Sequence, residues 1–214
     1  MNRPSFPPRA AFTLAELLTV IAIIALLMSL AGAALFSVNR GRQLARAGYD
    51  LVGVLEQARQ QAQAANTYTW VGLRETGDQT LEAVIVASRN GDDLPPVANT
   101  SDSGSGIVQV GKVFKWPNLK VVDLSGTGST RPDATPLEKV TPPIYTFVAG
   151  TSGTFGQYTI GFNSQGEATV ASGTLARCIE IGLQSAVEGK VIQSQDYVAV
   201  QIDGLTGNVT LYQP

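Results

Sequence analysis

Residues 12–38 read FTLAELLTVIAIIALLMSLAGAALFSV and carry a single charged side chain, Glu16. From Leu17 to Val38 there are 22 residues without a charge, and as a helix they would extend ~33 Å, enough to cross the hydrocarbon core of a bilayer. A carboxylate at the edge of such a run loses hydration and gains nothing from lipid. The stretch therefore predicts a membrane-spanning helix in which Glu16 meets a cation.

The composition narrows the possible functions. The 214 residues include 22 Gly and 11 Pro, which favour many turns over a helical bundle. The net charge is −2 and the pI is about 5.2, so the chain has no basic field of the kind that nucleic-acid binding uses. Histidine is absent, which removes the usual general base and the commonest metal ligand. The sequence predicts no enzyme, no cofactor and no metal site, and its one cysteine, Cys178, excludes an internal disulfide.

Small residues recur at helical spacing within the predicted span. They are Ala15, Ala22, Ala25, Ser29 and Gly32. Such a stripe lets helices approach closely in lipid, where no hydrophobic effect separates a helix from its surroundings. The alternative is that alanine is simply common in apolar helices.

The N-terminal motif resembles the prepilin processing motif of type IV prepilins and type II secretion pseudopilins. It comprises a basic leader, residues 1–11, then Phe12-Thr13-Leu14-Ala15-Glu16-Leu17-Leu18 and the apolar run behind it. The resemblance implies that the membrane-bound prepilin peptidase cuts between Ala11 and Phe12 and methylates the new N-terminus at Phe12. Glu16 then becomes the fifth residue of the mature chain, where the family has Glu. Ala11 departs from the Gly that usually precedes the cut.

The same resemblance implies a location and a set of partners. The protein would be a single-pass inner-membrane subunit with a cytoplasmic leader and a periplasmic domain, extractable into a filament. Its implied partners are the prepilin peptidase, other pilin or pseudopilin subunits, an inner-membrane assembly platform and membrane lipid. Glu16 would pair with the α-ammonium of Phe12 in a neighbouring subunit and fix the axial stagger of two helices. The alternative is that Glu16 merely reaches the interface of a plain anchor.

Residues 39–66 continue the helix with an amphipathic pattern. One apolar stripe is formed by Leu44, Leu51, Leu55, Ala58, Ala62 and Ala65. Gly41 and Gly48 lower the local helix stability, and Asn66 is a candidate C-cap because Asn tolerates the left-handed conformation. We expect this half of the helix to pack on a folded domain.

Residues 67–214 predict a β-rich domain. A hairpin is expected at residues 68–73 and 80–87, and further strands at 107–114, 119–124, 144–148, 158–162, 168–171, 177–183, 197–202 and 208–212, with loops at 89–106 and 125–143. The expected fold class is α+β, with a long N-terminal helix packed on an antiparallel β-rich domain. The element order, together with residues 162–166 and the last hairpin, resembles the H-type minor pseudopilin and implies a pilin-like fold and a minor subunit.

Two other functions fit parts of the sequence. Leu17 to Met28 resembles the apolar region of a signal peptide, with a small-residue site at residues 31–33, which would release a soluble β-domain. A DNA-binding minor pilin is the other alternative, because Lys112, Lys115 and Lys120 interleave with Phe114 and Trp116. Without the leader the chain has 13 basic and 17 acidic residues, so nucleic acid is not an expected partner. Asp92, Asp93 and Asp102 offer oxygen ligands for Ca²⁺, but loop solvation explains them better.

Overall fold

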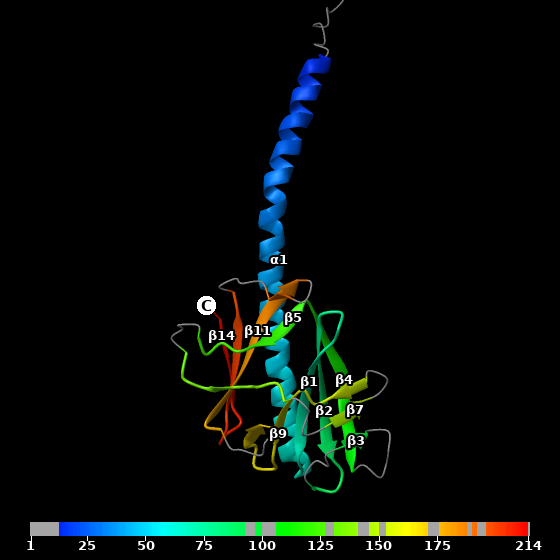
Figure 1. Ribbon diagram of the computed structural model, residues 1–214, viewed down its shortest axis with the longest axis vertical. Helices are drawn as coiled ribbons and strands as arrows, with labels where there is room; N and C mark the ends of the chain where they lie inside the picture. The colour runs from blue at the N-terminus through cyan, green and yellow to red at the C-terminus, as the bar shows by residue number, and fades with distance from the viewer. Residues whose placement is uncertain are drawn as a thin grey trace, which may run out of the picture. The chain divides into compact units, whose positions relative to one another are not determined.

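The computed structural model describes residues 13–92, 97–99, 106–126, 131–140, 146–149, 153–170, 176–187, 190–191 and 196–213, with the backbone alone at 30–40 and 97–99. The chain divides into two units, Met1–Gly41 and Arg42–Pro214. The elements are α1 (Leu14–Ala65), β1 (Thr69–Glu75), β2 (Thr80–Ser88), β3 (Val97–Asn99), β4 (Ile107–Pro117), β5 (Leu119–Val122), β6 (Thr135–Pro136), β7 (Thr146–Ala149), β8 (Gly153–Phe155), β9 (Tyr158–Phe162), β10 (Ala168–Val170), β11 (Cys178–Val187), β12 (Lys190–Val191), β13 (Val198–Asp203) and β14 (Val209–Tyr212). This is an α+β fold, as the sequence predicts (Figure 1).

The end of α1 is fixed by Asn66. Its φ is 48°, the left-handed conformation that closes a helix. The Thr67 N–H donates to the Ala62 carbonyl at 3.0 Å and the Asn66 N–H to the Gln63 carbonyl at 3.3 Å, so two of the last four carbonyls of the helix are satisfied. The predicted C-cap is confirmed.

The C-terminal half of α1 packs on the sheets through the predicted stripe. Leu51, Leu55, Ala58 and Ala62 are fully buried, whereas Ala65 is exposed. They share one core with apolar side chains of β1, β2, β9, β11 and β13. Packing a helix stripe against sheet faces is the standard way to bury both.

The first sheet has the order β10-β9-β1-β2-β4, with every pair antiparallel. Val71 and Leu73 of β1 belong to the core beneath α1, while Trp70 lies in a second core with Phe147 and Phe155. Successive residues of a strand point to opposite faces, so this sheet is covered on both sides. The second cover is the three-stranded sheet β3-β7-β8.

Gly72 allows the three-stranded sheet β3-β7-β8 to approach β1 closely. A Cβ at Gly72 would lie 2.2 Å from the Phe147 ring, far inside van der Waals contact. The ring of Phe147 stands near that of Phe155, with centroids 6.4 Å apart. A glycine is therefore required where the aromatic layer meets the middle of β1.

The second sheet has the order β12-β11-β13-β14, and β5 and β6 also pair with β11. Residues 131–140, here called the strap, run along it and form β6. Arg131 anchors the strap, because its Nε and Nη2 lie 2.5 and 3.0 Å from the Glu180 carboxylate, and both side chains are almost fully buried. Gln201 donates to both Glu180 and the Pro132 carbonyl at 2.8 Å. Because both carboxylate oxygens of the buried Glu180 are bonded, this ion pair holds the strap in one arrangement on the sheet.

The predicted hairpin is confirmed, since β1 and β2 pair from Thr69–Ala87 to Glu75–Leu81. The predicted strand at 158–162 is confirmed with the same bounds as β9. The other predicted strands appear with shifted ends, and the largest shift is in β11, which continues to Val187. The structure adds β3, β6, β8 and β12, each of two or three residues. Such short strands exist through their pairing partners, so local sequence carries little signal for them.

The predicted membrane span, residues 12–38, lies only partly within the described residues, because Phe12 and the side chains of 30–40 are outside them. Among the described residues, no helix is both long and apolar enough to cross a membrane. The span therefore remains a prediction.

Candidate processing and assembly segment

The first turn of α1 is closed by a reciprocal pair of hydrogen bonds between Thr13 and Glu16. The Thr13 N–H donates to Glu16 Oε2 at 2.9 Å, and the Glu16 N–H donates to Thr13 Oγ1 at 3.2 Å. This is a capping box, which satisfies two of the unpaired N–H groups at a helix start. Glu16 therefore has a role within its own chain besides the predicted pairing between subunits.

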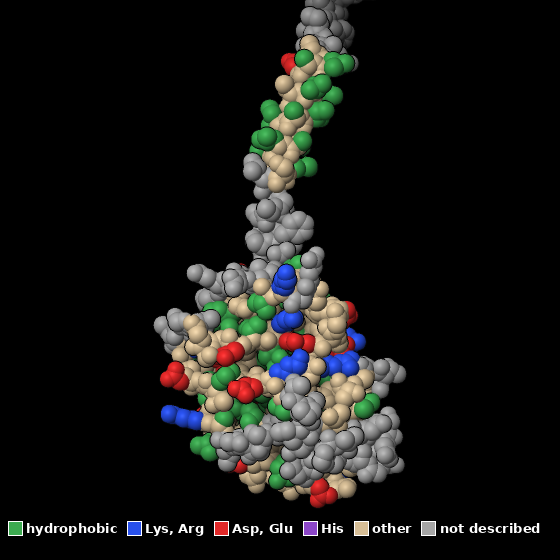
Figure 2. All heavy atoms as spheres, viewed as in Figure 1, with side chains coloured by type: hydrophobic (Ala, Val, Ile, Leu, Met, Phe, Trp, Pro, Cys, Tyr) green, Lys and Arg blue, Asp and Glu red, His purple; other side chains and the backbone are tan. Residues whose placement is uncertain are grey.

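Residues 13–29 are exposed on every side of the helix. Ten large apolar side chains lie between Leu14 and Met28, with exposed fractions from 46% to 81%. Figure 2 shows hydrophobic side chains along this segment. Exposed apolar surface on this scale marks a segment that binds lipid or protein.

Polar side chains within this segment bond to their own helix. The Thr19 hydroxyl donates to the Ala15 carbonyl at 2.7 Å, and the Ser29 hydroxyl to the Leu26 carbonyl at 2.8 Å. A hydroxyl that is satisfied by a preceding turn does not need water, so both residues are compatible with an apolar environment.

The predicted site residues are placed only in part. Ala15, Ala22, Ala25 and Ser29 are exposed on α1, and their packing role stays a prediction. The cleavage residues Ala11 and Phe12 lie outside the described residues, and for Gly32 only the backbone is described. Sequence analysis missed the role of Thr13, although Thr-x-x-Glu before an apolar run is a known signal for a capping box.

Two glycines in the C-terminal half of α1 differ in their surroundings. A Cβ at Gly48 would lie 2.6 Å from Val198 Cγ1 and 3.0 Å from Leu211 Cδ1, so the domain itself requires glycine there. A Cβ at Gly53 would have nothing within 4 Å. Gly53 is exposed one turn after Tyr49, whose side chain is 64% exposed. Glycine inside a helix costs about 1 kcal/mol relative to alanine, and at Gly53 no contact within the described chain accounts for that cost.

The basic and aromatic residues of β4 are used within the domain. Lys115 Nζ lies 2.7 Å from the buried Glu82 carboxylate. Trp116 is buried and donates its indole N–H to Asp50 at 3.2 Å, and its ring stacks near Phe114. Lys112 lies 5.5 Å over the Phe114 ring. Aromatic rings that face the core are not a platform for nucleic-acid bases.

Cys178 lines a groove on the second sheet. Its thiol is 3.7 Å from Gln201 Oε1, and burial together with the Asp203 and Glu180 charges raises the pKa of the thiol. A raised pKa leaves the sulfur protonated and weakly nucleophilic at neutral pH. Hydrogen bonds from the Thr206 backbone and hydroxyl lower the pKa of Asp203. The described residues contain no cluster of three metal-ligating side chains, and Asp93 and Asp102 lie outside them.

Comparison with known proteins identifies the N-terminal segment. The family described as "Prokaryotic N-terminal methylation motif" matches residues 7–32, which contain the predicted cleavage site and Glu16. No curated protein and no solved structure matches the chain. The motif supports a prepilin-like protein of the type IV pilin and pseudopilin family, and it implies processing by prepilin peptidase and assembly with other pilin subunits.

Proposed function

We propose that this protein is a minor subunit of a type IV pilus or type II secretion pseudopilus. Prepilin peptidase cuts it between Ala11 and Phe12 and methylates Phe12. The helix from Phe12 to Val38 holds it in the inner membrane with the β-rich domain in the periplasm. It enters a filament through that helix and is a substrate of the peptidase and not itself an enzyme.

The observation that carries the proposal is the methylation motif at residues 7–32, within which the helix α1 begins at Leu14 and then continues to Ala65. Two features support it. Residues 13–29 are apolar around the whole helix, as expected for a segment surrounded by lipid or by other helices. The C-terminal half of the same helix is amphipathic and packs on a domain through one stripe. The H-type assignment rests on the resemblance of residues 162–166 and on the element order, a long helix followed by antiparallel strands and a last hairpin, β13–β14.

The role of Glu16 is tested with two substitutions. Glu16→Ala removes both the carboxylate charge and the capping box. Glu16→Gln removes the charge but keeps a side chain that completes a capping box. If the carboxylate pairs with the Phe12 ammonium of a neighbouring subunit, both variants are cut and inserted normally, and both are missing from sheared filaments. Normal incorporation of Glu16→Gln contradicts the ion pair and leaves helix capping as the role of Glu16.

N-terminal sequencing of the membrane-bound protein tests processing. The proposal requires a mature chain that starts at N-methylated Phe12. A start near Ala34 would mean cleavage by signal peptidase and release of a soluble β-domain, and the pilin proposal would be wrong. Ala11→Gly restores the usual residue before the cut, so the fraction of processed chain should rise or stay equal. A fall in that fraction would contradict the assigned cleavage site.

A further inference from the structure

A groove of about 510 Å³ lies on the outer face of the second sheet, the face turned away from α1. Val200, Ile202 and Leu211 pack in the core beneath α1, so the alternate residues of β13 and β14 point to the outer face. The strand register places Gln201 beside Thr210 there. The volume falls within the range of roughly 300–1,000 Å³ that is typical of ligand sites.

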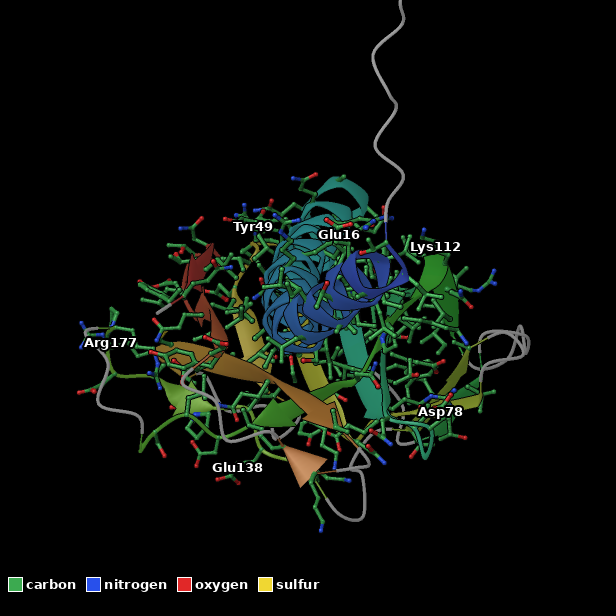
Figure 3. The ribbon with its side chains drawn as sticks, turned by 90° about the horizontal axis from the view of Figure 1, so that it is seen from above. Glu16, Tyr49, Asp78, Lys112, Glu138 and Arg177 are labelled. Atoms are coloured by element: carbon green, nitrogen blue, oxygen red, sulfur yellow. The ribbon has the colours of Figure 1, made fainter. Side chains whose placement is uncertain are left out.

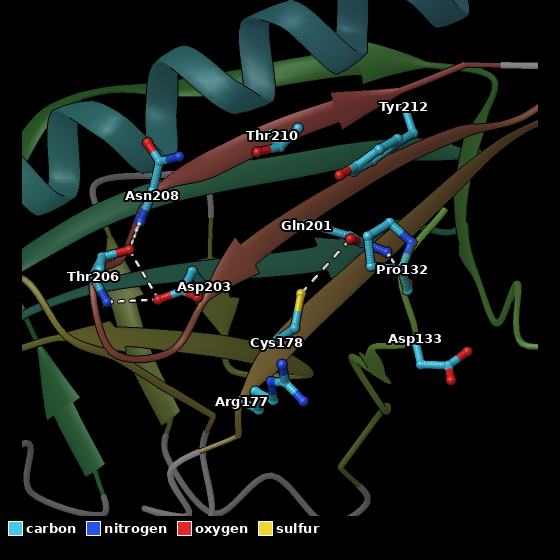
Figure 4. A pocket seen from close by; sticks show the side chains of 10 residues that line it. All are labelled: Pro132, Asp133, Arg177, Cys178, Gln201, Asp203, Thr206, Asn208, Thr210 and Tyr212. Atoms are coloured by element: carbon cyan, nitrogen blue, oxygen red, sulfur yellow. Dashed lines mark hydrogen bonds between the residues drawn. The ribbon is translucent and has the colours of Figure 1, made fainter. Parts of the chain in front are cut away.

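The groove runs between the strap and β14. The Gln201 amide donates to the Pro132 carbonyl at 2.8 Å, so the first residues of the strap are fixed as one wall. The opposite wall is a row of side chains on β14, Asn208, Thr210 and Tyr212 (Figure 4). A site that is held in place before its ligand arrives loses little conformational freedom on binding.

Several polar groups of the groove are not used by the domain. The three side chains of the β14 row make no hydrogen bond to a described residue. Gln201 is only 3% exposed, and within the described part of the chain its Oε1 accepts only from the Cys178 thiol, at 3.7 Å. A thiol is a weak donor, so this buried amide oxygen lacks a full partner. The groove therefore offers a buried acceptor for an N–H group, with hydroxyl and amide groups beside it.

The charges around the groove disfavour an anionic ligand. The charged side chains that line it are Asp133, Asp203 and Arg177. Burial and, after it, the charge of Asp203 raise the pKa of the Cys178 thiol, so the field at the groove is negative. Lys112 of β4 lies on the opposite side of the domain from Arg177 (Figure 3), so it does not offset that field. A phosphate group would meet more negative than positive charge.

The remaining chemistry suits a sugar. Among the described residues that line the groove none is large and aliphatic, and the lining mixes donors with acceptors. A sugar hydroxyl both donates and accepts, so it can bridge a carboxylate and a guanidinium group. An acetamido group adds an N–H for Gln201 Oε1 and a carbonyl oxygen for Arg177. The half-buried Tyr212 offers a ring face on which the C–H groups of a sugar ring can pack.

We propose that this groove binds a neutral oligosaccharide of N-acetylated hexosamines. An acetamido N–H donates to Gln201 Oε1, and the ring hydroxyls bond to the β14 row and to Asp133. The acetamido methyl group packs against Pro132. The proposal concerns the β-rich domain alone and stands whether or not the chain enters a filament.

The test is calorimetric titration of the full-length protein, in micelles of a detergent without a sugar headgroup, with chitohexaose, the neutral hexamer of N-acetylglucosamine. We expect saturable binding. Maltohexaose has hydroxyls but no acetamido group and should bind about tenfold more weakly. The deacetylated, cationic hexamer should bind no more tightly than chitohexaose. The proposal is overturned if chitohexaose shows no saturable binding up to about 5 mM, if maltohexaose binds equally, or if the cationic hexamer binds more tightly.

Two variants locate the site. Thr210→Val and Tyr212→Phe each remove one hydroxyl that no described residue uses, so the stability of the domain should not change. Each should weaken chitohexaose binding about twofold to tenfold, because one hydrogen bond is lost. Thr154→Val makes the matched change at an exposed position of β8 and should bind as the unmodified protein does. Unchanged binding by both groove variants contradicts the site.

Cys178 gives an independent readout, because it is the single cysteine of the chain and lines the groove. Chitohexaose at about ten times its Kd should slow alkylation of this thiol by iodoacetamide about tenfold, since an occupied groove covers the sulfur. Maltohexaose at the same concentration should slow it only about twofold. An unchanged rate of alkylation would place the sugar elsewhere and overturn the proposal.

Discussion

The two halves of α1 are both rich in apolar residues, yet only one is buried within the chain. Between Leu14 and Met28 apolar side chains occupy every side of the helix, and all are exposed. Between Leu44 and Ala62 they occupy one stripe, and that stripe is buried under the sheets. A stripe can be satisfied by one sheet face, whereas a helix that is apolar all round needs lipid or several helices. The first half is therefore a surface for other molecules and the second a part of the domain.

The largest difference in stability is expected when a leucine is replaced by alanine in each half of α1. Leu51→Ala empties a fully buried site and should lower the free energy of unfolding of the domain by about 2–5 kcal/mol. Leu26→Ala changes a side chain that is 63% exposed and should leave that free energy unchanged. Urea unfolding of the full-length protein in micelles, followed by tryptophan fluorescence, measures both. Equal losses of unfolding free energy would mean that the N-terminal half of α1 also contributes to the stability of the domain.

The second contrast uses the two glycines. Gly48→Ala drives a methyl group into Val198 and Leu211 and should destabilise the domain by about 1–3 kcal/mol. Gly53→Ala meets nothing and gains helix propensity, so it should stabilise the domain by about 0.5–1 kcal/mol. The same unfolding measurement applies. If the Gly53→Ala variant is more stable but is incorporated into filaments less well, Gly53 makes a contact between subunits. Normal incorporation of the variant would show that Gly53 makes no such contact.

The smallest contrast concerns the two ends of α1. Asn66→Ala replaces a residue that tolerates the left-handed conformation, here with φ of 48°, by one that tolerates it less well, and should cost about 1 kcal/mol of domain stability, while Asn66→Gly should not destabilise. Thr13→Ala removes the capping box and should increase hydrogen exchange only in the first turn, with domain unfolding unchanged. A loss of domain stability in Thr13→Ala would show that the first turn is coupled to the sheets.

Much of the fold followed from periodicity. The stripe from Leu44 to Ala62, the cap at Asn66 and the first hairpin were all predictable, because each depends on residues close in sequence. The short strands were not, since two or three residues form a strand only when another segment supplies the partner. The strap is the clearest case, because Arg131 and Glu180 are 49 residues apart and nothing local marks them as a pair.

The sequence by itself determined the processing motif, the charge pattern of the N-terminal helix and the α+β class, since these depend on residue type and spacing along one helix or strand. Only the tertiary structure decided that Thr13 and Glu16 close a capping box, that Gly48 is required and Gly53 is not, and that a polar groove lies open beside β14. Those properties depend on distances between side chains, which are set by how the helix and sheets pack and not by the order of residues alone.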